Sequence, residues 1–227
     1  MKTKLSYLAL AVFVFFFLPQ CRARAGDWSA EVVEKVQGAT VTVYAFDKAG
    51  KHFNQGSGFF FEESGHLITN YHVLGRAASA RVKTFDGGEF TVKSIVAEDP
   101  QGDIVEAEVD LPGGPTPYLM PAELPAGVGD PVMVVGSPLG VAGVTSKGKV
   151  LQVGEMEGVG ECFAHDAGAA HGSSGSPVVN PGGEVIGMET AGLTDRPGVN
   201  FAIPVKRFSG LTSSYRELET VKAPVAR

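Results

Sequence analysis

Cysteine is scarce in this chain of 227 residues, which contains only Cys21 and Cys162. Two cysteines cannot form the network of disulfides on which many small secreted domains depend, so stability must come from packing. The HExxH motif and paired CxxC motifs are also missing, and a zinc hydrolase would therefore lack its ligands. We expect neither a metal nor an organic cofactor in this protein.

Apolar runs long enough to cross a bilayer are missing too. The run from Tyr7 to Leu18 has twelve residues, whereas a membrane-spanning helix needs about 20. Lys2 and Lys4 precede this run, and the small-x-small site Ala23-Arg24-Ala25 follows it. This arrangement is typical of a secretory signal peptide. We expect residues 1–25 to be removed and the protein to be periplasmic or secreted, with no stable membrane span in the mature chain.

Cys21 leaves a second interpretation of this leader open, because lipoprotein signals end in a cysteine. Gln20 stands where such signals carry a small residue, so we favour cleavage after Ala25 over lipidation at Cys21. Cleavage would remove four of the 19 basic residues and leave 15 against 25 acidic ones, a formal charge of −10. Nucleic acid and anionic membrane surfaces are poor partners for such an acidic chain.

Charged residues make up only 19% of the chain, whereas 44% are hydrophobic, which is enough apolar material for a well-buried core. Thirty glycines and 14 prolines separate short β-branched or aromatic runs, a pattern that favours strands and tight turns. A proline-rich passage from Leu111 to Gly127 is interpreted as an interdomain connection. We expect an all-β fold of two antiparallel six-stranded β-barrels, over residues 26–115 and 116–227. The expected strands cover residues 41–46, 58–61, 66–70, 80–85, 89–96, 104–109, 131–135, 143–146, 149–153, 160–163, 177–179, 184–190 and 199–203.

Two helices are expected near the ends of the mature chain. Closely spaced valines favour a short helix from Trp28 to Gln37. The segment from Val205 to Val221 is polar with apolar residues three to four apart, which predicts an amphipathic closing helix. Those apolar residues are Phe208, Leu211, Tyr215 and Leu218.

The stretch HDAGAAHGSSGSPVVN, residues 165–180, places three serines and three glycines between Gly168 and Pro177. A serine hydroxyl becomes a good nucleophile only when a positioned base takes its proton. The histidines at positions 52, 66, 72, 165 and 171 all precede Ser174. This order excludes an α/β-hydrolase with Ser174 as nucleophile, because there the histidine follows the serine. Without a base, these hydroxyls would only satisfy the backbone of a turn.

His72 and Asp103 are the candidates for the base and its acid. His72 follows a predicted strand in ITNYHVL, and Asp103 opens another in DPQGDIVEAEV. Taken singly, such a histidine is usually a hydrogen-bonded structural residue and such an aspartate a turn former. Asp99 competes for the role of acid, and we prefer Asp103 because it heads the apolar strand, with Val105 and Ala107 on its own face.

The order His72, Asp103, Ser174, with intervals of 31 and 71 residues, resembles that of the trypsin-like serine proteases. In that family the first barrel carries the histidine and the aspartate, and the second carries the serine. The sequence is most similar to the HtrA/Deg branch, and the likeness covers nearly the whole mature chain. The segments that carry it are GSGFFFEESGHLITNYHVL, DPQGDIV, VGSPLG, HDAGAAHGSSGSPVVN, GEVIGMETA and GVNFAIPV.

The resemblance implies a serine endopeptidase that acts on proteins or peptides. The family pattern Gly-x-Ser-Gly-x-Pro makes Ser174 the nucleophile, with His72 as general base and then general acid, and Asp103 as the carboxylate that orients it. The backbone amides of Gly172 and Ser174 would form the oxyanion hole. Family members commonly have Asn-Pro where this chain has Ala170-His171, which leaves the resting order of the loop open.

Gly168 stands six positions before Ser174, where enzymes that cut after Arg or Lys carry an aspartate, so cleavage after basic residues is not expected. With Phe201, Ala202 and Ile203 as pocket wall, we predict cleavage after small or medium aliphatic residues. The SGSPV ending also resembles bacterial glutamyl endopeptidases and leaves acidic specificity as an alternative. The full set of residues expected at the substrate pocket is Gly168, Thr190, Asn200, Phe201, Ala202 and Ile203.

Two other functions remain open. A catalytically silent protein could keep this fold and bind peptides or a partner, and a membrane-anchored structural protein could use residues 1–25 as its tether. HtrA-type proteins usually continue into PDZ domains, whereas this chain ends at Arg227, so we expect no regulation by that module. Both a monomer and a trimer are compatible with the sequence.

Overall fold

The computed structural model describes residues 28–113, 116–156, 160–190 and 198–220. The predicted signal peptide, including Cys21, lies outside these ranges, as does the predicted domain boundary at residue 115. None of the helices in the described ranges is long and apolar enough to span a membrane.

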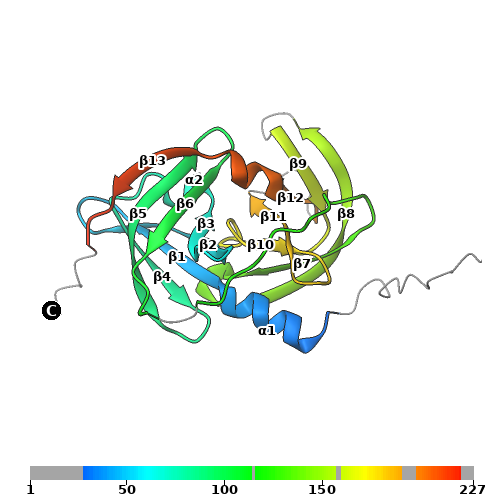
Figure 1. The fold of residues 1–227 in the computed structure, drawn as a ribbon, viewed down its shortest axis with the longest axis horizontal. Coiled ribbons are helices and arrows are strands. Elements are labelled where there is room, and N and C mark those ends of the chain that lie inside the picture. The colour runs from blue at the N-terminus through cyan, green and yellow to red at the C-terminus, as the bar shows by residue number, and fades with distance from the viewer. Residues whose placement is uncertain (1–27, 114–115, 157–159, 191–197, 221–227) are drawn as a thin grey trace, which may run out of the picture.

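The described chain consists mainly of antiparallel strands that form two six-stranded barrels side by side (Figure 1). The predicted all-β fold is therefore confirmed. The first barrel contains β1 (Thr40–Phe46), β2 (His52–Phe61), β3 (His66–Thr69), β4 (Ser79–Thr84), β5 (Glu89–Asp99) and β6 (Ile104–Val109). The second contains β7 (Pro131–Gly136), β8 (Val144–Met156), β9 (Gly160–His165), β10 (Pro177–Val179), β11 (Val185–Thr190) and β12 (Asn200–Pro204).

The two barrels share one topology, because each is a circle of its strands in the order first, second, third, sixth, fifth, fourth. In the first, the strand order is β5-β4-β1-β2-β3-β6, and pairing of β5 with β6 completes the circle. In the second, the closed order is β10-β11-β12-β9-β8-β7. Val41 and Val43 are among the buried side chains of the first interior, and Phe163, Ile186 and Ala202 are among those of the second. Each interior is thus filled by apolar side chains from alternate strand positions.

A third apolar cluster joins the barrels to each other. Side chains from both barrels meet in it, and α1 (Ala30–Ala39) packs against the same cluster. Because interiors are packed as densely as crystals, a continuous core of this kind fixes the two barrels relative to one another. Its members include Trp28, Val36, Phe59, Ile68, Ile104, Met133, Met188 and Ile203.

The two predicted helices have different outcomes. The N-terminal helix is confirmed as α1, and it begins after Ser29, whose Oγ accepts a hydrogen bond from Val32 N at 3.2 Å. The closing helix predicted over residues 205–221 is wrong. That segment forms a short 3₁₀ helix, η2 (Val205–Gly210), followed by a strand, β13 (Thr212–Glu217).

The strand β13 forms because the edge of β5 offers partners for its backbone. Thr212 pairs with Glu98 and Ser213 with Ala97. Serine and threonine compete with helical hydrogen bonds and are weak helix formers, so they do not oppose this pairing. Tyr215 is 67% exposed, which shows that the apolar spacing in this segment does not mark a buried helix face.

Two strands predicted at residues 143–146 and 149–153 are one continuous strand, β8. Gly148 lies within this strand. A Cβ at this position would come within 2.3 Å of Ala167 N. The glycine therefore permits a close approach of two backbone segments rather than a turn.

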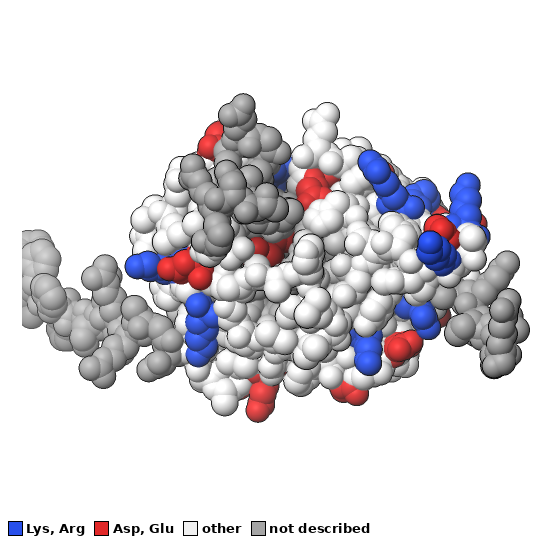
Figure 2. Space-filling model, turned by 180° about the vertical axis from the view of Figure 1, so that it is seen from behind, with Lys and Arg blue, Asp and Glu red and all other residues white. Residues whose placement is uncertain are grey.

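The distribution of charged side chains can be followed on one face of the molecule (Figure 2). In the view from behind, Lys, Arg, Asp and Glu lie mainly around the edge of the face, with both signs interspersed, and uncharged residues cover its centre (Figure 2). Some of the charges form exposed pairs, such as Arg81 with Glu89 and Lys93 with Glu108, each at 3.2 Å. Exposed pairs contribute little to stability, so the fold depends mainly on its apolar cores.

Candidate active site

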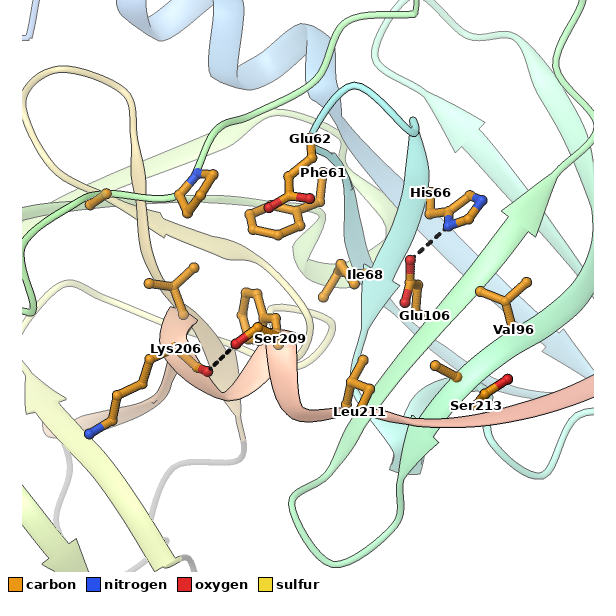
Figure 3. A pocket seen from close by; sticks show the side chains of 15 residues that line it. Phe61, Glu62, His66, Ile68, Val96, Glu106, Lys206, Ser209, Leu211 and Ser213 are labelled. Atoms are coloured by element: carbon orange, nitrogen blue, oxygen red, sulfur yellow. Dashed lines mark hydrogen bonds and ion pairs between the residues drawn. The ribbon is translucent and has the colours of Figure 1, made fainter.

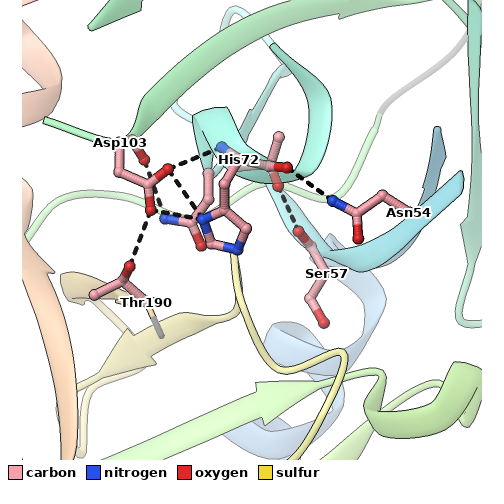
Figure 4. A network of polar contacts seen from close by, with 7 residues as sticks. Asn54, Ser57, His72, Asp103 and Thr190 are labelled. Atoms are coloured by element: carbon pink, nitrogen blue, oxygen red, sulfur yellow. Dashed lines mark hydrogen bonds and ion pairs between the residues drawn. The ribbon is translucent and has the colours of Figure 1, made fainter. Parts of the chain in front are cut away.

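His72 and Asp103 lie next to each other at the ends of two paired strands (Figure 4). Strand β3 leads into a single helical turn, α2 (Tyr71–Leu74), which carries His72. Asp103 immediately precedes β6, and β6 pairs with β3 so that Val105 is opposite Thr69. The antiparallel pairing therefore brings together two side chains that are 31 residues apart in the sequence.

The Asp103 carboxylate is bound on several sides. Its Oδ2 lies 2.8 Å and its Oδ1 3.0 Å from His72 Nδ1. Oδ1 also accepts a hydrogen bond from the His72 backbone amide at 2.9 Å, and Thr190 Oγ1 of the second barrel donates to Oδ2 at 2.9 Å. Because an ionised carboxylate only accepts hydrogen bonds, Nδ1 carries the hydrogen and Nε2 of the neutral ring keeps its lone pair.

The backbone of Asp103 is in the left-handed region, with φ at +58°. Asn70 Nδ2 donates to its carbonyl oxygen at 3.1 Å and helps to hold it there. Aspartate tolerates this conformation better than most residues, and such conformations concentrate at functional sites. Asp99, the competing acid, instead accepts hydrogen bonds from Arg207 Nη2 at 3.0 Å and from Gly102 N at 2.8 Å. Of these two carboxylates, the structure brings Asp103 to the histidine.

Ser174 lies in the loop between β9 and β10, which packs directly on the first barrel. Its carbonyl oxygen accepts a hydrogen bond from Ser57 N at 2.8 Å. A Cβ on Gly56 would lie 2.7 Å from Val73 Cγ2 and 3.0 Å from Ser174 O. This glycine therefore lets the serine loop and the turn that carries His72 approach the same strand. Among the described residues, no hydrogen bond joins the Ser174 hydroxyl to the His72 ring.

Two glycines of the serine loop have positive φ angles, +94° at Gly172 and +88° at Gly175. A Cβ on Gly172 would lie 2.7 Å from Gln55 Nε2 and 2.9 Å from Ser137 O. A Cβ on Gly175 would lie 2.0 Å from Ser57 O. Both the backbone angle and the lack of space therefore require glycine at these positions.

Two backbone amides of the loop point away from anchored carbonyls. His171 O accepts a hydrogen bond from Leu139 N at 2.9 Å, and Ser173 O accepts one at 2.9 Å from an amide three residues further on. In a trans peptide the N–H points opposite to the C=O. The amides of Gly172 and Ser174 belong to these two peptide groups and so point to the other side. Within the described chain, neither amide donates a backbone hydrogen bond.

The residues predicted to line the substrate pocket occupy several different environments. Asn200 Nδ2 donates to Ala167 O at 2.7 Å and thereby braces the segment beside Gly168, whose amide donates to Ser146 Oγ at 2.6 Å. Gly168 and Ser173 also line a hollow of about 170 Å³. Three further side chains are buried in three separate apolar clusters; they are Phe201, Ala202 and Ile203.

A hollow of about 670 Å³ lies elsewhere, against β3 and β6 (Figure 3). Phe61, Ile68 and Phe208 contribute apolar walls to it, and its edge carries a His66–Glu106 pair with 2.7 Å between Nδ1 and Oε1. None of the three predicted catalytic residues lines this hollow. The polar network of Figure 4, rather than a cavity volume, therefore identifies the candidate site.

A model of the trypsin-like peptidase domain matches residues 56–188, a range that includes all three predicted catalytic positions. The chain belongs to this family. The periplasmic serine endoprotease DegP of Escherichia coli strain K12 is 33% identical over 175 residues, which cover 74% of this chain and 37% of DegP. The chloroplastic Protease Do-like 1 of Arabidopsis thaliana is 30% identical over 183 residues, which cover 75% of this chain and 41% of that protein.

A solved structure gives the same fold for a related protein. The serine endoprotease from Yersinia pestis superposes with a TM-score of 0.70 over 79% of this chain and 63% of that chain, at 24% sequence identity. These relatives confirm the predicted resemblance to HtrA/Deg proteases. The chain spans less than half the length of the two curated relatives.

Sequence reasoning missed two polar contacts of the site. Thr190 is predicted as a pocket residue, yet its hydroxyl binds Asp103. Ser57 Oγ donates to Gly172 O at 2.7 Å and accepts from Ser137 N at 2.9 Å, so one hydroxyl ties two loops of the second barrel to the first. The position of Ser57 between two glycines is a local hint of close packing, but its partners are 80 residues or more away in the sequence.

Proposed function

We propose that this chain is an exported serine endopeptidase that hydrolyses peptide bonds through Ser174, His72 and Asp103. The observation that carries the proposal is the fixed orientation of His72, whose Nδ1 lies 2.8 Å from a carboxylate that Thr190 also binds. Membership of the trypsin-like peptidase family supports it, and the periplasmic location given in the name of DegP supports export.

The reaction follows from the orientation of His72. Its Nε2 takes the proton of the Ser174 hydroxyl while the serine oxygen bonds to the carbonyl carbon of the substrate. Asp103 stabilises the imidazolium, which then gives its proton to the leaving amine as the C–N bond breaks. A water molecule, activated by His72 in the same way, hydrolyses the acyl-enzyme. The contact between base and nucleophile often tightens only when substrate binds, which accounts for its absence in the resting site.

The amides of Gly172 and Ser174 stabilise the oxyanion in this proposal. Attack on the carbonyl places negative charge on its oxygen, and preorganised N–H donors at about 3 Å lower the energy of that state. The two amides share peptide groups whose carbonyls are anchored on the opposite side. One such donor typically contributes about 2.7–4 kcal/mol to transition-state stabilisation.

Small or medium aliphatic residues are the proposed preference before the scissile bond. Gly168 offers no countercharge for a basic side chain, and its amide is already bound to Ser146 Oγ. Apolar contacts with a modest number of polar groups are typical of such pockets. A digest of a peptide library checks this preference, and cuts mainly after Glu, Lys or Arg would contradict it.

Cleavage of unfolded, fluorescently labelled casein tests the proposed activity. The exported protein is expected to cleave casein, and Ser174→Ala to lose that activity. Ser176→Ala is the matched control, because the Ser176 hydroxyl is buried without a hydrogen-bond partner in the described part of the chain and its loss should leave cleavage intact. Equal cleavage by Ser174→Ala and wild type would refute the assignment of the nucleophile.

A catalytically silent peptide-binding protein is the second candidate function. The absence of a hydrogen bond between the Ser174 hydroxyl and the His72 ring in the described structure is also what this alternative predicts. This alternative predicts that casein binds, as measured by fluorescence anisotropy, but is not cleaved at any pH or in the presence of any added peptide.

Export by a cleaved signal peptide is part of the proposal. N-terminal analysis of the exported protein is expected to find Gly26 as the first residue. A mature chain that begins at an acylated Cys21, or at Met1, would instead support a membrane tether.

A further inference from the structure

His165 and Glu189 form a pair of ionisable side chains inside the second barrel. Their exposed fractions are 0% and 1%, and His165 Nε2 lies 2.8 Å from Glu189 Oε2. His165 ends β9, Glu189 lies on β11, and β12 runs between these two strands. Glu189 pairs with Ala202, which belongs to the interior of the barrel, and His165 pairs with Asn200. The pair therefore reaches across β12 on the inner face of the barrel.

Burial of the His165–Glu189 pair costs free energy, because both side chains lose their contact with water. Within the described residues, none of the polar side-chain atoms of His165 and Glu189 has a hydrogen-bond partner, so their contact has the distance of a hydrogen bond but not its alignment. Burial raises the pKa of the Glu189 carboxyl, and His165 opposes this rise. Apolar side chains of similar volume are often at least as stable as a buried ion pair. Stability alone therefore gives no reason for these two residues at this place.

The backbone next to this pair holds both halves of the proposed site. Glu189 O accepts a hydrogen bond from Gly175 N at 2.9 Å, and Glu189 N donates to Ser176 O at 2.8 Å, so Glu189 binds the two residues that follow the proposed nucleophile. The next residue, Thr190, donates to Asp103 Oδ2 at 2.9 Å. The dipeptide 189–190 thus contacts the serine loop and the acid of the first barrel at once.

We propose that His165 and Glu189 are positioning residues of the protease site. Their contact across β12 fixes the dipeptide 189–190, and the dipeptide sets the position of Ser174 relative to Asp103. The inference rests on the proposed function. The pair acts through the backbone of β11 and touches no substrate. Because a displacement of about 1 Å can lower a rate about 100-fold, loss of the contact lowers kcat and leaves KM nearly unchanged.

The double variant His165→Leu/Glu189→Leu tests this role. Two leucines fill the interior but form no polar contact across β12. We expect kcat for labelled casein to fall about tenfold or more and KM to stay within about threefold, while the thermal unfolding midpoint equals or exceeds that of the wild type. Ile186→Val is the matched control, because Ile186 is an apolar residue of the same strand and the same interior. It is expected to lower the midpoint and leave kcat unchanged.

The outcomes separate the inference from the proposed function. Wild-type kcat in the folded double variant would overturn the inference, since apolar packing would then suffice, as would a change confined to KM. Should the double variant not fold, Glu189→Gln decides instead, because it keeps the shape of the side chain and removes the ionisable carboxyl. An unchanged kcat in Glu189→Gln would equally overturn the inference. A wild-type protein that never cleaves casein refutes the proposed function, and the inference with it.

Discussion

Thr190 of the second barrel donates a hydrogen bond to Asp103 of the first, with 2.9 Å between Oγ1 and Oδ2. In the opposite direction, Ser57 of the first barrel donates its amide to the carbonyl of Ser174 at 2.8 Å. Each barrel therefore holds a proposed catalytic element of the other. Changes at these contacts are expected to affect the reaction more than the free energy of unfolding.

Replacing Thr190 with valine keeps the shape of the side chain and removes the donor to Asp103. A hydrogen bond to a charged group contributes about 1.5–3 kcal/mol, so kcat/KM for casein is expected to fall about tenfold or more, and Thr190→Ser to retain most of the activity. Thr42→Val is the control, because the buried Thr42 hydroxyl has no partner among the described residues. Wild-type activity in Thr190→Val would show that the contact between the barrels does not support the acid.

Asparagine at position 103 distinguishes the two candidate acids. Asp103→Asn removes the carboxylate that fixes the tautomer of His72, and a loss of about 10⁴-fold in kcat is expected. Asp99→Asn weakens the pair with Arg207 and the hydrogen bond from Gly102 N, so it should lower stability slightly and leave kcat near the wild-type value. Casein cleavage by both variants measures the difference. A larger loss of kcat in Asp99→Asn than in Asp103→Asn would show that Asp99, and not Asp103, is the acid.

Alanine at Gly172 should damage the proposed oxyanion hole. Gly172 and Gly87 have the same φ of +94°, but a Cβ on Gly172 meets Gln55 Nε2, whereas nothing lies within 4 Å of a Cβ on Gly87. Both variants are expected to lose about 1–2 kcal/mol of stability from backbone strain. Only Gly172→Ala should also lose about 100-fold in kcat. Similar kcat values for the two variants, measured while both are folded, would argue against this oxyanion site.

The sequence predicts the features that depend on local patterns and misses those that depend on distant partners. Short apolar strands and the His72, Asp103, Ser174 order carry enough information for the fold and the proposed triad. The contact of Thr190 with Asp103 spans 87 residues, and nothing near either residue predicts it. The wrong closing helix has the same cause, because the segment after Gly210 becomes a strand only where the edge of β5 is available to it.

Cys162 gives a prediction about pH. Burial raises the pKa of its thiol above the ordinary value of 9.0, and Glu155 and Glu161 raise it further. The thiolate is the reactive form, so iodoacetamide should alkylate the native protein slowly at about pH 8 and the urea-unfolded protein quickly. Mass spectrometry of the two samples measures this difference. Equal rates of alkylation would show that the fold neither shields the Cys162 thiol from the reagent nor raises its pKa.

The raised pKa of Cys162 also makes the stability of the protein depend on pH. The native state keeps the thiol proton to higher pH than the unfolded state does. The contribution of the Cys162 thiol to the free energy of unfolding is therefore fully present below pH 9.0. It is lost as the pH rises through the pKa of the thiol in the native state. Urea titrations across this range should show a decline in the wild type that is smaller in Cys162→Ala, and parallel curves would contradict the assignment.

The most direct test of the account is to locate the adduct that a fluorophosphonate probe forms with the exported protein. Peptide mapping is predicted to find the adduct on Ser174 in the wild type and to find almost none in His72→Ala, because only the oriented imidazole activates that hydroxyl. Equal labelling of Ser174 in both proteins, or an adduct on a different serine, would contradict the claim that His72 and Ser174 work together.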